Sequence, residues 1–356
     1  MAPTPRKIFV FAPADETDAS NRALIAAGCA ITEGKASWHT PQGDNEADMI
    51  GLGAGAHAFS GTSIRSSPIT GRIMDAAPDL RIVAKYTIGV DDVDVEAATE
   101  RGILVTHCPT EANWGGVAET TMAMLLAITK KVRERDAAVK AGKWREVELL
   151  ATGVGPRGDG YEGLTIGLVG FGRIGRRLAD LLRPWRVKLL INDPYLTPDV
   201  APLYGVQEVD LPTLLKESDV VSVHVTLTAE TRHMCNQAFF DGMKKGAIFI
   251  NTSRGLTQDE NALAVALASG QVGYAALDVF EDEPLAKGSP LFALGDKVLL
   301  SPHMASQTTD GGLKPGIVWT TRSLIKALKG ELPDNVYNKE VIPRWLDRFG
   351  GKNLLG

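Results

Sequence analysis

Three side chains that could carry acid–base and electrostatic chemistry each follow an apolar run typical of a β-strand. In sequence order they are Arg254, Glu283 and His303. In open α/β sheets, ligands bind beyond the carboxyl ends of the strands, so residues at these positions can converge on one site. A planar arginine fork can bind a carboxylate and a carbonyl oxygen together, and a histidine can deliver a proton to a developing alkoxide. Reduction of a 2-oxo acid needs both of these groups together with a hydride donor such as a nicotinamide, so the set is compatible with that reaction.

The carboxylate has a defined place in that chemistry. Glu283, if hydrogen-bonded to the imidazole of His303, would fix the orientation of the ring and favour its imidazolium form. Taken singly, the arginine could pair with a loop carboxylate, the glutamate belongs to an acidic run, and the histidine could lie at the start of a helix. Their occurrence together, after three successive strands, favours the catalytic interpretation.

A glycine-rich turn near the middle of the chain predicts a dinucleotide site. Residues 168–175 read Leu-Val-Gly-Phe-Gly-Arg-Ile-Gly, between an apolar run and a helical pattern. Gly170 permits a sharp turn, Gly172 lets backbone amides approach a pyrophosphate, and Gly175 lets the helix pack closely on its strand. Asp193 ends the next apolar run, at about the ~20-residue spacing where an acid binds the ribose hydroxyls and repels the 2′-phosphate of NADP. The alternative is an ordinary turn in another α/β protein, and the flanking pattern together with Asp193 favours the dinucleotide site. The same acid favours NAD over NADP.

The position of this turn predicts two domains. It lies in the middle of 356 residues, so a separate unit must fold before it. We expect a smaller α/β substrate domain over residues 1–108, completed by 304–356, and a dinucleotide-binding domain over 109–303. The glycine- and serine-rich segment 51–67 is expected to be a loop, and Val117–Gly142 a single long helix. Strands of the first domain are predicted at Lys7–Phe11, Asp48–Leu52, Arg81–Ala84 and Ile103–Thr106.

The second domain shows a regular alternation of strand and helix signals. Its strands are predicted at Leu164–Val169, Val187–Ile191, Val220–Val225, Ala247–Asn251, Gly273–Leu277 and Val298–Ser301. Helical patterns separate these runs, which is typical of a doubly wound parallel sheet with right-handed crossovers. The fold class is therefore α/β, with a Rossmann-type sheet in this domain.

Several strings along the chain resemble the signatures of the D-isomer-specific 2-hydroxyacid dehydrogenase family. They are Gly89–Asp94, Ala97–Ile103, Val117–Glu119, Asn251–Gly255, Ala276–Pro284 and Ser301–Ser306. The resemblance spans most of the chain. It implies an NAD-dependent enzyme that interconverts a 2-oxo acid and a D-2-hydroxy acid, with a flavodoxin-like substrate domain before the Rossmann domain.

The resemblance also implies roles for individual residues. Arg254, Glu283 and His303 match the family's catalytic set. The amides of Arg173 and Ile174 would meet the pyrophosphate, Asp278 would accept a hydrogen bond from the nicotinamide carboxamide, and Thr252 would flank the same ring. The amides of Thr87, Ile88 and Gly89 would hold the substrate carboxylate. The chain departs from the family at Thr120, where a histidine is common, and at Val225–Leu227, which replaces a turn containing proline.

Composition limits the partners. A formal net charge of -5 gives no basic surface for nucleic acid or an anionic membrane, and no apolar run approaches the length of a membrane span. The three cysteines form no CxxC pair, which suits reduced thiols in a cytoplasmic protein. No histidine pattern indicates a metal. We expect a homodimer built through the long helix, because its apolar residues exceed the needs of one face.

A second class of function stays open at this level. The corepressors of the C-terminal-binding-protein type resemble these enzymes and keep their catalytic set, yet they sense NAD and act by recruiting partners. Turnover of a panel of 2-oxo acids would separate the two. The substrate is also open among glyoxylate, hydroxypyruvate, phosphoglycerate, longer oxo acids and phosphite, whereas a formate dehydrogenase would carry an amide in place of Glu283.

Overall fold

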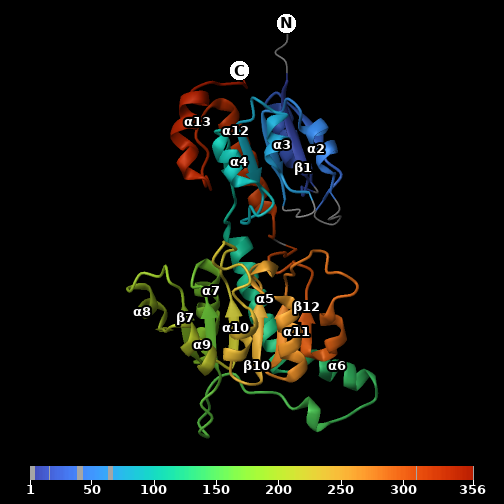
Figure 1. The fold of residues 1–356 in the computed structure, drawn as a ribbon, viewed down its shortest axis with the longest axis vertical. Coiled ribbons are helices and arrows are strands. Elements are labelled where there is room, and N and C mark those ends of the chain that lie inside the picture. Colours follow the sequence, from blue (N-terminus) through green and yellow to red (C-terminus); the bar gives the residue numbers. More distant parts are fainter. Residues whose placement is uncertain (1–4, 16, 38–42, 63–66, 310, 356) are drawn as a thin grey trace. The chain divides into compact units, whose positions relative to one another are not determined.

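The computed structural model describes residues 5–15, 17–37, 43–62, 67–309 and 311–355. The chain forms two compact units (Figure 1). Unit 1 comprises Met1–Asn113 and Gln307–Gly356, and unit 2 comprises Trp114–Ser306. None of the helices in these described ranges is long and apolar enough to cross a membrane.

Unit 1 is built on a parallel sheet of five strands in the order β2-β1-β3-β4-β5. This is the flavodoxin-like order, and it confirms the fold class expected for the smaller domain. The strands are β1 (Arg6–Ala12), β2 (Cys29–Glu33), β3 (Ala58–Gly61), β4 (Ile82–Lys85) and β5 (Leu104–Thr106). The helices of its first part are α1 (Ala19–Ala26), α2 (Glu46–Gly53), α3 (Gly71–Asp75) and α4 (Val95–Glu100).

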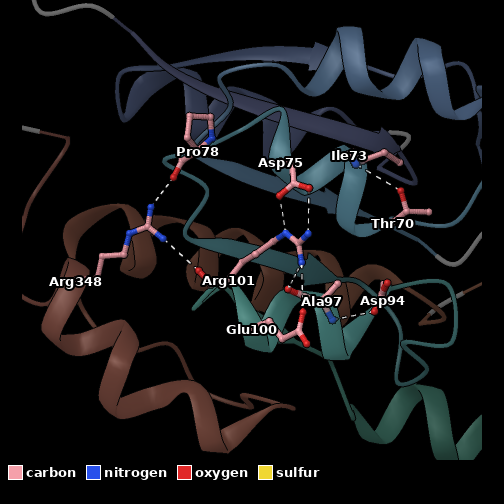
Figure 2. Close-up of polar contacts among 9 residues, drawn as sticks. All are labelled: Thr70, Ile73, Asp75, Pro78, Asp94, Ala97, Glu100, Arg101 and Arg348. Carbon is pink, nitrogen blue, oxygen red and sulfur yellow. Dashed lines mark hydrogen bonds and ion pairs between the residues drawn. The ribbon is translucent and has the colours of Figure 1, made fainter.

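The C-terminal segment completes unit 1. Helices α12 (Lys314–Lys329) and α13 (Ile342–Phe349) bury Leu324 and Trp345 in one core with residues of β1, β4 and β5. The Trp345 indole donates to the Arg81 carbonyl at 2.8 Å. Figure 2 shows Arg348 of α13 reaching the carbonyls of Pro78 and Arg101. The end of the chain is therefore part of the fold of its beginning.

Two expectations for unit 1 are wrong. The run 48–52, expected as a strand, lies inside helix α2, because Asn45 caps that helix by accepting from the Asp48 amide at 2.9 Å, and Glu46 and Asp48 place negative charge in its first turn. The segment 51–67, expected as a loop, contains the end of α2 and all of β3, while residues 63–66 lie outside the described part. All four residues of β3 are buried, and the strand lies between β1 and β4 in the sheet.

Unit 2 is built on a parallel sheet of seven strands in the order β12-β11-β10-β9-β6-β7-β8. The chain runs outward in one direction from β6 and then in the other from β9, as in a doubly wound Rossmann sheet, which confirms the expected architecture. The strands are β6 (Thr165–Val169), β7 (Lys188–Asn192), β8 (Gln207–Glu208), β9 (Val220–Val223), β10 (Ala247–Asn251), β11 (Val272–Leu277) and β12 (Val298–Leu300). The main helices are α5 (Glu111–Thr129), α6 (Val132–Lys140), α7 (Arg173–Leu182), α8 (Val200–Tyr204), α9 (Leu211–Glu217), α10 (Gln237–Gly242) and α11 (Glu260–Ser269).

The long helix expected over Val117–Gly142 is two helices. Lys131 adopts a left-handed backbone with φ 52° between α5 and α6, which ends the first helix and starts the second in a new direction. The ammonium groups of Lys130 and Lys131 then donate to the carbonyls of Thr152 and Glu148. The break is therefore held by contacts with the segment that follows α6.

Candidate active site

The glycine turn lies where β6 ends and α7 begins. Gly170 has φ 93°, and a Cβ there would lie 2.8 Å from the carbonyl oxygen of His224. A Cβ at Gly175 would lie 2.6 Å from the carbonyl of Gly170. These two glycines are thus required by the packing of the turn against its own helix and against the end of β9.

Gly172 is different, because a Cβ at this position would lie within 4 Å of no atom of the described residues, its own chain neighbours aside. It is the N-cap residue of the ten-residue helix α7 and lies exposed beside Arg173. A glycine at the N-cap has no side chain to accept from the amides of the first turn, which include those of Arg173 and Ile174. The open space and the helix N-terminus together fit the pyrophosphate of a dinucleotide.

Asp193 lies directly after β7 and is tied to the glycine turn. Its Oδ2 accepts from the Phe171 amide at 2.8 Å, and its Oδ1 accepts from the Tyr195 amide at 3.0 Å. These bonds fix the carboxylate next to the turn and leave each oxygen a further lone pair for ribose hydroxyls. The residues present therefore fit the adenosine half of the cofactor.

Arg254 follows β10 at the start of a short 3-10 turn, and it is half-buried. Asn251 organises this loop: its side-chain oxygen accepts from the amide and hydroxyl of Ser253, and its amide group donates to the carbonyl of Arg254 at 3.1 Å. The Nη1 of Arg254 donates to the Ser253 carbonyl at 2.7 Å. The guanidinium is thus held at the carboxyl edge of the sheet.

The loops after β10 and β11 lie in direct contact at Gly255. A Cβ there would overlap the Phe280 carbonyl group, with its oxygen only 1.8 Å away. The position after Arg254 must therefore be glycine, so that the arginine loop can pack against the backbone that leads to Glu283. The sequence shows the adjacent Arg-Gly pair, but this packing reason is visible only in three dimensions.

Glu283 and His303 form the pair that the sequence analysis predicted. The Nδ1 of His303 lies 2.7 Å from Oε2 of Glu283, and the side chains are 37% and 18% exposed respectively. The second carboxylate oxygen of Glu283 accepts from the Phe280 amide at 3.0 Å. The carboxylate is thus held from its own loop, and it fixes the ring so that Nε2 is directed away from the pair.

His303 itself has a left-handed backbone, with φ 55°. The two amides that follow it, those of Met304 and Ala305, donate to the two carboxylate oxygens of Asp278 at 2.9 Å each. Asp278 directly follows β11 and is only 1% exposed. This buried carboxylate therefore holds the turn that carries the histidine, a role that no local pattern of residues indicates.

Helix α5 supports the same turn from another side. The Thr120 hydroxyl donates to the Ala305 carbonyl at 2.9 Å. The hydroxyls of Thr121 and Thr252 lie 2.9 Å apart, which ties the helix to the loop after β10. Thr120, the position that departs from the family's usual histidine, thus has a structural contact of its own.

His224 lies at the end of β9 beside the glycine turn. Its Nε2 lies 2.9 Å from the Ser222 hydroxyl, and burial lowers its pKa from 6.5 to about 4. The ring is therefore neutral at physiological pH. It acts as a structural histidine next to the expected cofactor site.

The remaining expected site residues belong to unit 1, where they follow β4. The Thr87 carbonyl accepts from the Cys108 amide at 2.9 Å, and the Thr87 hydroxyl donates to the Gly89 carbonyl at 3.0 Å. Nδ1 of His107 lies 3.1 Å from the Ile88 carbonyl. The loop Thr87–Gly89 is thus braced by the residues that follow β5, and unit 2 holds all the other expected site residues.

The chain is similar in sequence and in fold to several dehydrogenases and reductases. Residues 122–305 match the model of the NAD binding domain of the D-isomer specific 2-hydroxyacid dehydrogenases. The chain is 43% identical over 278 residues to a glyoxylate reductase of Thermofilum pendens, covering 77% of this chain and 79% of that one. It is 36% identical to a D-3-phosphoglycerate dehydrogenase of Methanocaldococcus jannaschii, covering 78% of this chain and 51% of the relative. The D-lactate dehydrogenase of Aquifex aeolicus, solved with NAD and lactic acid, superposes with a TM-score of 0.78 at 28% identity, covering 95% and 98% of the two chains.

Proposed function

The chain belongs to the D-isomer specific 2-hydroxyacid dehydrogenase family and is an NAD-dependent oxidoreductase; from this premise we propose that it interconverts a small 2-oxo acid and its D-2-hydroxy acid with His303, Glu283 and Arg254 as the catalytic set. The observation that carries the proposal is the 2.7 Å contact between His303 and Glu283 after two adjacent strands, β12 and β11. The similarity to a glyoxylate reductase makes glyoxylate the first substrate to test.

Each protein group has a defined task in reduction. NADH held at the glycine turn and Asp193 would supply the hydride for the carbonyl carbon. Arg254 binds the substrate carboxylate and the carbonyl oxygen through its planar fork, which draws negative charge toward that oxygen. The imidazolium of His303 donates its proton from Nε2 to the same oxygen, and the neutral ring takes the proton back during oxidation.

Glu283 acts on the histidine and not on the substrate. Its carboxylate accepts from Nδ1, so it selects the tautomer in which Nε2 exchanges the proton and it stabilises the charged ring. To the loop Thr87–Gly89 of unit 1 we assign the binding of the substrate carboxylate through backbone amides. We assign unit 1 the role of substrate domain and unit 2 that of NAD domain.

The test is turnover of glyoxylate, hydroxypyruvate and 3-phosphohydroxypyruvate with NADH, followed by its absorbance. The His303→Ala variant should lose about 10²–10⁴-fold in turnover, the usual contribution of one acid–base group, while NADH binding at the glycine turn is retained. The Glu283→Gln variant keeps the size of the side chain but removes the charge that stabilises the imidazolium, so turnover should fall while NADH binding is retained. Near-normal turnover in His303→Ala would remove this assignment.

We also propose that the protein is a homodimer of the cytoplasm. The segment after α6 carries Trp144, Val147 and Leu150, which are 71%, 75% and 69% exposed. The Arg135 guanidinium donates to the Leu149 carbonyl and, together with the two lysine contacts described above, holds this segment in place. A fixed, exposed apolar segment suits contact with a second copy. The three cysteines are free and buried, in keeping with a reducing compartment.

The dimer is tested by sedimentation of the protein at micromolar concentration. The Val147→Asp variant should shift the protein toward the monomer, because it places a charge on the proposed interface, while Asp159→Asn, on an exposed loop before β6, should not. A monomeric unmodified protein would contradict the proposal.

A further inference from the structure

A hydrogen bond joins two loops at the carboxyl edge of the unit 2 sheet. The Tyr195 hydroxyl donates to Oε2 of Glu230 at 3.0 Å. Tyr195 follows β7 and Glu230 follows β9, and in the sheet β6 lies between these two strands. The bond therefore connects the loops on either side of the strand that leads into the glycine turn, at the point where the strand order reverses and ligands of such sheets bind.

Both ends of this bridge are anchored. The Tyr195 amide donates to Asp193, whose other oxygen accepts from the Phe171 amide in the glycine turn. Glu230 lies in a turn closed by the Thr231 hydroxyl, which donates to the Thr226 carbonyl at 2.6 Å. The Tyr195–Glu230 hydrogen bond thus joins two loops, and each loop is also fixed by hydrogen bonds of its own.

The fold gives little reason for this contact. Tyr195 is 80% exposed and Glu230 is also exposed, so a hydrogen bond between them adds little to stability. An exposed aromatic ring beside the acid that faces the ribose offers a surface on which a purine base can stack. The hydrogen bond to Glu230 raises the pKa of Tyr195, and the charges of Glu230 and Asp193 act in the same direction. Two acids therefore share this small region of the surface.

We propose that Tyr195, held in place by Glu230, forms the outer wall of the adenosine part of the cofactor site, and that Glu230 is a second acid, besides Asp193, that disfavours the 2′-phosphate of NADP. The proposal rests on the NAD site described above. It adds Tyr195 and Glu230 to Asp193 as residues that contact the adenosine part of the cofactor. The ring contributes contact with the base, and the carboxylate contributes both the position of the ring and negative charge.

The ring is tested by titrating the full-length protein with NADH and following nucleotide fluorescence, without substrate. Tyr195→Ala should weaken NADH binding by about 5- to 150-fold, the range for loss of one base–aromatic stack. Tyr195→Phe keeps the ring and should lose much less. The midpoint of thermal unfolding without cofactor should stay the same in both variants. Unchanged NADH affinity in Tyr195→Ala would overturn the proposal, as would an equal loss in Tyr195→Phe.

The charge is tested with Glu230→Gln, which keeps an acceptor oxygen for the tyrosine but removes the carboxylate. NADPH binding should tighten several-fold, while NADH affinity changes by less than about twofold, because only the 2′-phosphate is repelled. The control is Glu162→Gln, an exposed acid before the amino end of β6, which should alter neither affinity. An unchanged ratio of NADPH to NADH affinity in Glu230→Gln would overturn the role of the charge.

These outcomes are separable from the fate of the proposed function. Normal NADH binding by Tyr195→Ala, in a protein that reduces glyoxylate through His303, would reject this inference alone. Full turnover by His303→Ala would reject the catalytic assignment, whereas the binding titrations would still decide the role of Tyr195 and Glu230.

Discussion

Replacing Asp278 by asparagine tests whether this buried carboxylate holds the turn that carries His303. The side chain keeps its size, but only one acceptor oxygen remains for the amides of Met304 and Ala305. The new NH₂ group faces the other amide, so a donor meets a donor. A hydrogen bond to a charged group is worth about 1.5–3 kcal/mol, and at a site only 1% exposed water cannot replace the lost bond.

That loss should appear in stability and in turnover. For a domain the size of unit 2, each kcal/mol lowers the unfolding midpoint by about 2–4 °C, so we expect a fall of about 3–12 °C. His303 has φ 55°, which the turn must maintain against an intrinsic preference for other conformations. If the asparagine frees the turn, reduction should slow by about 10- to 100-fold, which corresponds to the same range of free energy.

Circular dichroism during heating and initial rates of NADH oxidation with glyoxylate measure the two effects, and fluorescence titration gives NADH affinity separately. Asp282→Asn is the matched control, because this acid lies in the same loop after β11 and is exposed. An unchanged midpoint and an unchanged rate in Asp278→Asn would refute the clamp. A loss of NADH affinity alone would assign Asp278 to the nicotinamide carboxamide, as the family resemblance implies, and would also refute the clamp.

Three further predictions concern the cofactor, the substrate and acid stability. Asp193→Ala should shift the preference between NADH and NADPH toward NADPH by about 1–3 kcal/mol, measured as the ratio of kcat/KM for the two cofactors, and equal use of both by the unmodified protein would contradict the role of this acid. Arg254→Lys should raise KM and lower kcat together in steady-state reduction of glyoxylate, because the charge survives and the bidentate geometry does not; a change in KM alone would show that the arginine binds without polarising. Burial lowers the pKa of His224 to about 4. Between pH 6.5 and about 4 the unfolded chain therefore binds a proton that the folded chain does not. The free energy of unfolding should fall by at most about 3 kcal/mol as the pH is lowered over that range. Denaturant titrations across this range should show a flatter pH dependence for His224→Asn, and an identical dependence would contradict it.

The parts of the fold that the sequence predicted are those set by local pattern. Strand β10 covers the expected run Ala247–Asn251, and β12 lies within the expected run Val298–Ser301. Each is a short apolar or amphipathic run bounded by polar residues, so hydrophobic periodicity alone decides it. The glycine turn could be predicted for the same reason, because it is defined by residue types at fixed spacing.

The errors arise where local signals compete or where distant contacts decide. Residues 48–52 include an apolar run that suits a strand, but the cap at Asn45 and the acids behind it favour a helix start. Nothing near Lys131 signals that α5 must end there, because a lysine with φ 52° is stabilised by contacts with a segment that follows later in the chain. Helix propensity does not predict such a break, because lysine is a good helix former.

The candidate site divides along the same line. Arg254, Glu283 and His303 could be predicted because β10, β11 and β12 are neighbours in the sheet in the order in which they occur in the chain, so residues that follow them are brought to one edge. What could not be predicted is the layer that fixes them: Gly255 against the Phe280 carbonyl and Asp278 against the turn after His303. These contacts depend on how the loops fold at the ends of the strands. They are made by backbone carbonyl and amide groups, which every residue type has, so the sequence does not indicate them. A search by residue type therefore finds the three candidate side chains, whereas the groups that hold their loops in place are found only from the backbone hydrogen bonds of the structure.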